Sequence, residues 1–84
     1  APPAAPRKKL TDKDQRDYEL LPARIDEIDR QVAVAEAELA DGSLFTRDHA
    51  RFAELTALLD ALRAEKDAAE ERWLTLAEMA ERLQ

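Results

Sequence analysis

The side chains that could carry out acid–base or metal chemistry are few and isolated in this sequence. His49 is the only histidine, and the 84 residues include no cysteine. Catalysis or metal binding would require partner groups of complementary type, whereas His49 has Arg47 and Arg51 two positions away on either side. We therefore interpret His49 as a solvated surface residue.

Carboxylates are abundant, but their spacing is typical of a helix surface. The groups in question are Glu36, Glu38, Glu65, Glu70, Glu71, Glu78 and Glu81. On a helix flank such groups provide solubility and pair with basic residues three or four positions away. A pair acting as general acid and base would need burial that separates the two pKa values, and a chain with one glycine has no glycine-rich phosphate loop. We expect no catalytic residue, no bound cofactor and no metal site in this chain.

Two basic clusters remain as candidates for phosphate contacts. The N-terminal cluster comprises Arg7, Lys8, Lys9, Lys13 and Arg16, and the turn cluster comprises Arg47, His49 and Arg51. The whole chain has a formal net charge of −6, so most of its surface should repel nucleic-acid phosphates. Any nucleic acid must therefore bind through these local clusters.

Two apolar stripes with a seven-residue repeat predict the helices that hold the two basic clusters in place. The first contains Tyr18, Leu21, Ile25, Ile28, Val32, Ala35 and Leu39, and the second contains Phe52, Leu55, Leu59, Leu62, Lys66, Ala69, Trp73, Leu76, Ala80 and Leu83. Alternating steps of three and four keep such positions on one face of a slightly underwound helix. A short connection around Gly42 makes the two helices antiparallel neighbours. The sequence predicts an all-α fold, an antiparallel two-helix coiled-coil hairpin with a short N-terminal helical segment.

The N-terminal part of the chain divides at about residue 10. Residues 1–9 hold three prolines and three basic residues, so we predict a Pro-rich basic linker there and a coiled-coil domain over residues 10–84. Thr11 followed by Asp14 predicts a helix that starts at Asp12. Pro22 leaves two alternatives, because it either kinks this helix or ends it and begins a new one.

The turn region carries its own stop and start signals. We expect the helix before it to end near Ala40 and Gly42 to adopt the left-handed conformation. Leu44 and Phe45 should fold back against the adjacent helical turns, near Leu39 and Phe52. Asp48, or else Thr46, should cap the next helix.

The short turn also fixes a register. Leu39 should lie opposite Phe52 or Leu55, and Val32 opposite Leu59 or Leu62. Ile25 and Ile28 should then lie near Lys66, and Trp73 should reach Leu21 and Tyr18. Lys66 is a charged residue at a seam position, so either its ammonium extends to Glu65, Glu70 or Asp29, or it specifies the register.

Several of these motifs resemble a known family. They are Lys9-Leu10-Thr11, Gln15-Arg16, Leu20-Leu21-Pro22, the segment Asp-Gly-Ser-Leu-Phe at 41–45, Phe52-Ala53-Glu54-Leu55, and Glu71-Arg72-Trp73-Leu74. Together they resemble the C-terminal coiled-coil domain of ABC-F ATPases of the Uup type, over residues 9 to about 80. The resemblance implies a cytoplasmic parent ATPase whose two nucleotide-binding cassettes, outside this sequence, would bind ATP.

The resemblance also implies partners. Such proteins are associated with DNA, including branched DNA, and with the ribosome, and their tail domain is implicated in DNA binding. We therefore expect a non-catalytic, weakly DNA-binding domain whose phosphate contacts come from Lys8, Lys9, Lys13 and Arg16, with Arg47 and Arg51 as a second set. The alternative is a protein-interaction arm that contacts the ribosome or the cassettes. We expect a monomer without a membrane span, because no apolar run approaches the roughly 20 residues that a span requires.

Overall fold

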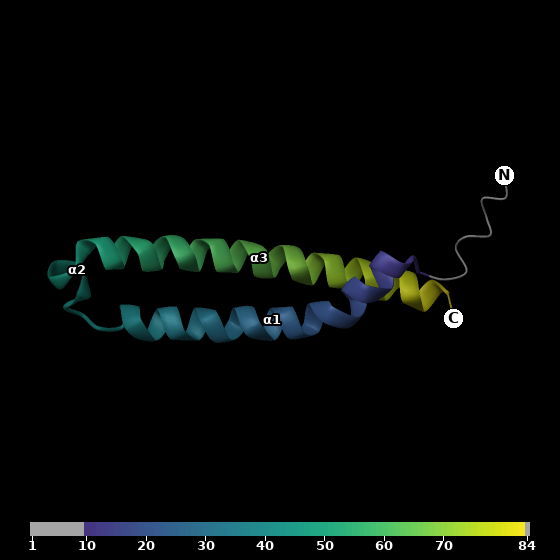
Figure 1. The fold of residues 1–84 in the computed structure, drawn as a ribbon, viewed down its shortest axis with the longest axis horizontal. Helices are drawn as coiled ribbons and strands as arrows, with labels where there is room; N and C mark the ends of the chain where they lie inside the picture. Colours follow the sequence, from purple (N-terminus) through teal and green to yellow (C-terminus); the bar gives the residue numbers. More distant parts are fainter. Residues whose placement is uncertain (1–9, 84) are drawn as a thin grey trace.

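The computed structural model describes residues 10–83, and within that range it consists of three helices. Helix α1 spans Asp12–Leu39, α2 spans Leu44–Arg47 and α3 spans His49–Arg82. The two long helices lie antiparallel, and α2 closes the turn between them (Figure 1). The molecule is a rod with extents of 64 × 20 × 16 Å. The predicted all-α helical hairpin is confirmed, whereas the proposed linker at residues 1–9 lies outside the described residues.

Side-chain caps set the first residues of both long helices. The hydroxyl of Thr11 accepts the backbone N–H of Asp14 at 3.1 Å, so α1 starts at Asp12 as predicted. The carboxylate of Asp48 accepts the backbone N–H of Arg51 at 3.0 Å, so Asp48 and not Thr46 caps α3. Such caps typically contribute about 1 kcal/mol each.

Pro22 kinks α1 without ending it. The helix is continuous from Asp12 to Leu39 with Pro22 inside it, and its first turns bend across α3 (Figure 1). Proline lacks an N–H and its ring crowds the carbonyl four residues earlier, which is that of Tyr18. The expected short N-terminal helical segment is therefore the first part of α1 and not a separate helix.

The core is a narrow seam of heptad positions. In the described part of the chain the buried apolar residues are Ile28, Ala35, Leu44, Leu55, Leu59, Leu62, Ala69 and Leu76. All of them except Leu44 belong to the two predicted stripes. Ala35, Leu55 and Leu59 form one cluster, against which Val32, Leu39 and Phe52 pack. This grouping agrees with the predicted register near the turn.

The chain reverses direction without a left-handed residue, so the prediction for Gly42 is wrong. No described residue has a positive φ. The carboxylate of Asp41 accepts the N–H and the hydroxyl of Ser43 at 2.9 and 2.8 Å, and its carbonyl accepts the N–H of Leu44 at 3.1 Å. These bonds form a local turn of the type that Asp side chains favour, and it makes the special conformation of glycine unnecessary.

The segment expected as a loop contains the short helix α2, which determines how its two apolar residues, Leu44 and Phe45, pack. Leu44 is buried, and Phe45 is 51% exposed but its ring packs against Phe52, so both residues fold back against the adjacent helices as expected. Successive helical residues point about 100° apart, so only one of the pair can face the core. The Phe45 ring lies edge-on to His49 at 4.4 Å and to Phe52 at 5.1 Å.

Candidate nucleic-acid interface

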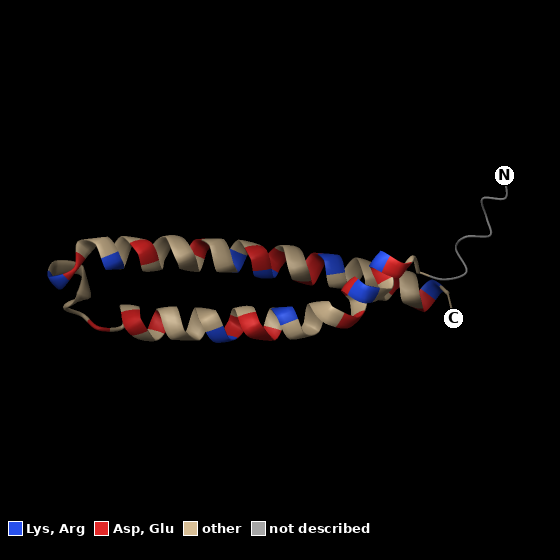
Figure 2. Ribbon diagram, in the orientation of Figure 1, with Lys and Arg blue, Asp and Glu red and all other residues tan. Residues whose placement is uncertain are grey.

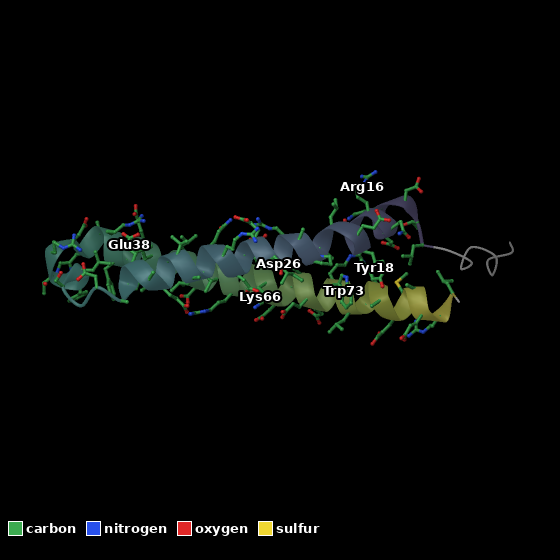
Figure 3. All side chains as sticks on the ribbon, turned by 90° about the horizontal axis from the view of Figure 1, so that it is seen from below. Arg16, Tyr18, Asp26, Glu38, Lys66 and Trp73 are labelled. Atoms are coloured by element: carbon green, nitrogen blue, oxygen red, sulfur yellow. The ribbon has the colours of Figure 1, made fainter. Side chains whose placement is uncertain are left out.

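The open end of the hairpin is held together by contacts between the first turns of α1 and α3. The rings of Tyr18 and Trp73 stack with centroids 5.6 Å apart, as predicted for Tyr18 (Figure 3). Next to the stack, Arg72 Nη2 donates to Asp14 Oδ1 at 2.7 Å and to Asp17 Oδ2 at 3.2 Å. These contacts fix the bent part of α1, and with it the residues of the N-terminal cluster that the structure describes.

Two residues of that cluster, Lys13 and Arg16, lie on the first turns of α1, one helical turn apart. The ammonium of Lys13 pairs with Asp17 Oδ2 at 2.8 Å. Hydrogen bonds from Lys13 and then Arg72 lower the pKa of Asp17 below its ordinary value of 3.8. Arg16 is exposed, takes part in none of the ion pairs among residues 10–83, and points away from the hairpin (Figure 3). Lys8 and Lys9 lie outside the described residues.

Sequence reasoning missed a further basic residue at this end, Arg82. It is exposed in the last turn of α3, and the first turns of α1 and the last turns of α3 lie at the same end of the rod (Figure 2). Within the part that the structure describes, Arg82 also makes no ion pair. The antiparallel arrangement could have identified it, because the last residues of the second helix must return to the start of the first.

The arginines of the turn cluster are bound to carboxylates. Arg47 Nη2 lies 2.6 Å from Asp41 Oδ2. Arg51 donates to both oxygens of Glu38, at 2.6 and 2.8 Å, and to Glu54 at 3.1 Å. These hydrogen bonds raise the pKa of Arg51 above its ordinary value and lower the pKa of Glu38. A phosphate that approached the turn cluster would have to compete with these three carboxylates for the arginines. The carboxylates lie on α1 (Glu38), in the turn (Asp41) and on α3 (Glu54).

Further ion pairs connect the two long helices along the rod. Arg24 Nε donates to Glu65 at 2.7 Å, and Arg63 Nη2 donates to Glu36 at 2.6 Å. The ammonium of Lys66 lies 2.6 Å from Asp29, which raises the pKa of Lys66. Of the alternatives for this seam lysine, the structure thus shows the extended one, with Asp29 as the partner. The same pair places Lys66 next to Ile28 in the predicted register.

The basic residues therefore differ in whether they are available to bind a phosphate. Ten Lys and Arg residues lie between residues 10 and 83, and the eight that form ion pairs are Lys13, Arg24, Arg30, Arg47, Arg51, Arg63, Lys66 and Arg72. Acidic and basic residues are interspersed along both long helices (Figure 2). The remaining two, Arg16 and Arg82, lie at the open end, where a phosphate would meet the least competition.

Other kinds of site lack the groups they need in the described residues. Residues 10–83 contain no group of three or more His, Cys, Asp or Glu side chains that could hold a metal ion. In the same range, no helix is long and apolar enough to cross a membrane. The architecture is that of a rod-like helical hairpin domain that presents charged side chains to its surroundings.

Comparison with known proteins places this hairpin in a family. The sequence model of the family described as "ABC transporter C-terminal domain" matches residues 9–78. A curated relative, the ATP-binding protein Uup of Haemophilus influenzae, is 39% identical over 71 residues, which cover 83% of this chain and 11% of that protein. No solved structure matches the chain. The chain belongs to the family of C-terminal domains of ABC-F-type ATPases, as its motifs predicted, and spans about a tenth of the length of the relative.

Proposed function

We propose that this chain is a non-catalytic coiled-coil domain that binds DNA weakly, without sequence preference, through phosphate contacts at the open end of the hairpin. The observation that carries the proposal is the exposed guanidinium of Arg16, which makes no ion pair among the described residues. The relative is named an ATP-binding protein, and we propose that ATP binds to cassettes of a cytoplasmic parent protein and not to this domain.

The N-terminal cluster supports binding at the open end better than the turn cluster does. Lys13 shares its carboxylate partner Asp17 with Arg72, so Asp17 keeps a partner when Lys13 turns toward a phosphate. Arg16 has no partner to release among the described residues, and Lys8 and Lys9 add two charges close by in sequence. Contacts of this kind position a protein on the duplex without reading its sequence.

The acidic body sets the strength and salt dependence of binding. The chain has a net charge of −6, and the acidic residues of the two helices repel phosphates outside the contact area. Binding should therefore be detectable at low salt and fall steeply as salt rises, because displaced counterions drive the association. We propose that the domain binds as a monomer.

The same acidic surface favours a second candidate, a protein-interaction arm that contacts the ribosome or the parent's cassettes. Eight of the ten basic residues between 10 and 83 are already paired, which suits a surface that avoids phosphates. The two candidates predict opposite outcomes for isolated DNA. An interaction arm would show no DNA binding at low salt.

A titration with matched variants tests the proposal. Wild type, Arg16→Gln and Arg30→Gln are titrated with duplex, branched and single-stranded DNA at two salt concentrations. Arg30 is a suitable control because it pairs with Glu27 on the same helix, at 2.6 Å, and its loss changes the net charge equally. Arg16→Gln should weaken binding to every duplex sequence alike and reduce the salt dependence. Equal losses in both variants would show that net charge, and not this position, determines binding.

A further inference from the structure

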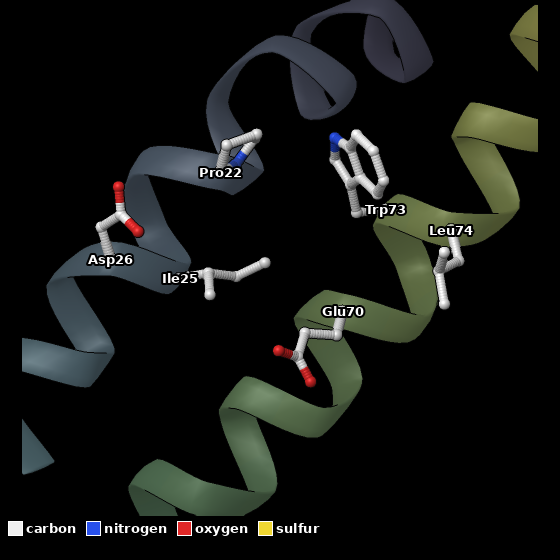
Figure 4. A pocket seen from close by; sticks show the side chains of 6 residues that line it. All are labelled: Pro22, Ile25, Asp26, Glu70, Trp73 and Leu74. Atoms are coloured by element: carbon white, nitrogen blue, oxygen red, sulfur yellow. The ribbon is translucent and has the colours of Figure 1, made fainter.

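An open groove of about 440 Å³ lies between α1 and α3 next to the kink in α1. Its lining consists of Pro22, Ile25, Asp26, Glu70, Trp73 and Leu74 (Figure 4). Its volume falls within the range of about 300–1,000 Å³ that is usual for ligand sites. The groove is therefore large enough for a few side chains of a partner.

The lining is apolar except for one carboxylate on each helix. Ile25 and Trp73 face the space between the helices, and Pro22 lies on α1 across from Trp73 (Figure 4). Leu74 is 57% exposed, although it is a large apolar side chain next to the groove. An apolar side chain placed here would remove this surface from water, at a gain of about 25 cal/mol per Å².

The two carboxylates of the groove, like several others on the rod, are not held in ion pairs among the described residues. Asp26 and Glu70 take part in none of the ion pairs among residues 10–83. The nearby ammonium of Lys66 interacts with Glu70 through space, but its hydrogen bond goes to Asp29. The groove thus combines apolar contact area with one carboxylate on each of its helices that forms no ion pair among residues 10–83.

We propose that this groove is a docking site for a basic peptide segment of a partner protein, in which an apolar side chain lies between Lys or Arg residues. The apolar side chain would pack against Ile25 and Trp73, and the flanking cations would pair with Asp26 and Glu70. A cation next to the indole would gain further attraction from the aromatic ring. Nucleic acid does not fit this surface, because its phosphates would face two carboxylates. The inference is independent of the DNA-binding proposal.

Trp73 provides the measurement, since it is the only tryptophan of the chain and lines the groove. The full 84-residue chain is titrated with the capped peptide acetyl-Arg-Leu-Leu-Arg-amide, and with acetyl-Glu-Leu-Leu-Glu-amide as the control peptide. The basic peptide should change the tryptophan emission in a saturable way, and the acidic peptide should not. Absence of a saturable change with the basic peptide would overturn the proposal.

Two double variants separate the groove from net charge. In Asp26→Asn with Glu70→Gln, affinity should fall about fivefold or more, from two exposed ion pairs lost. The matched control is Asp60→Asn with Glu78→Gln, which removes the same charge from exposed positions of α3 outside the groove. The control should bind like wild type. Equal losses in both double variants would overturn the proposal, since binding would then follow net charge alone.

Two further measurements test whether something other than a partner peptide fills the groove. If the variant Arg7→Gln, Lys8→Gln, Lys9→Gln binds the basic peptide several-fold more tightly than wild type, the chain's own N-terminal residues fill the groove and the external partner is refuted. If sedimentation shows that Leu74→Ser dissociates a wild-type dimer, a second copy fills it. The proposal requires that neither result is found, and that Leu74→Ser weakens peptide binding while the helix content is unchanged.

Discussion

Replacing Trp73 with alanine should destabilise the hairpin at its open end. Truncating a fully buried aromatic residue usually costs about 3–5 kcal/mol. Trp73 is partly exposed, so we expect a loss of about 2–3 kcal/mol, with about 0.5–1.5 kcal/mol of it due to the stack on Tyr18. For a domain of this size the melting temperature should fall by about 10–20 °C. Thermal melts followed by circular dichroism at the helix band measure this directly.

The neighbouring residue provides the matched control. Leu74 is 57% exposed, so Leu74→Ala should change the free energy of unfolding by no more than about 0.5 kcal/mol. Tyr18→Ala and the Tyr18/Trp73 double variant complete a cycle, which should report a coupling of about 0.5–1.5 kcal/mol for the stack. A Trp73→Ala loss below about 1 kcal/mol, or a coupling near zero, would refute the reasoning. The first turns of α1 would then be held by Arg72 alone.

Three other predictions test the seam, the turn and the ion pairs of the open end. Lys66→Leu should raise the melting temperature and leave the chain monomeric in sedimentation, because a leucine in the seam replaces an ion pair whose Asp29 partner is 51% exposed. A change in the sedimentation mass would mean that Lys66 specifies the register. Gly42→Ala should stabilise by about 0.4–1 kcal/mol, because φ is not positive there and an added Cβ meets nothing within 4 Å; a clear loss in chemical denaturation would contradict the turn geometry. The lowered pKa of Asp17 means that its contribution to stability is present above pH 3.8 and is lost as the pH falls below it. Melting temperatures measured from pH 6 to pH 2.5 should therefore fall less in Asp17→Asn than in wild type.

The seam was predictable from the sequence because one spacing rule determines it. Ile28, Leu55 and Leu76 are the largest fully buried side chains, and all three occupy heptad positions. A repeat that alternates threes and fours leaves a helix a single apolar face, so the fold follows from local periodicity.

The turn was harder to predict, because the same residues permit two geometries. Asp41, Gly42 and Ser43 suit a glycine in the left-handed conformation and equally an aspartate that bonds to Ser43. The choice depends on where α2 begins, and that depends on the burial of Leu44 against Ala35 and Leu55. Phe45 became exposed as a consequence.

The residue types of the candidate site were predictable from the sequence, but which of its arginines are free of carboxylate partners was not. Whether an arginine is free depends on which carboxylate the register brings opposite it. Glu38 is 13 residues from Arg51 in sequence, yet it accepts two hydrogen bonds from it. Arg82 is 66 positions from Arg16, but it belongs to the last turn of α3, which lies at the same end of the rod as the first turns of α1 (Figure 1). Such pairings are set by tertiary contacts, which composition and spacing do not reveal.

The central claim is that DNA phosphates meet the open end of the hairpin, and the salt dependence of duplex affinity tests it most directly. Affinity is measured over a series of salt concentrations for wild type, for a variant with Lys8, Lys9, Lys13 and Arg16 changed to Gln, and for Arg47→Gln with Arg51→Gln. The log–log slope should fall by up to about 0.9 for each contact removed in the N-terminal variant, and should change less in the turn variant. If the turn variant loses the slope and the N-terminal variant keeps it, or if wild type binds no DNA at low salt, the account is contradicted.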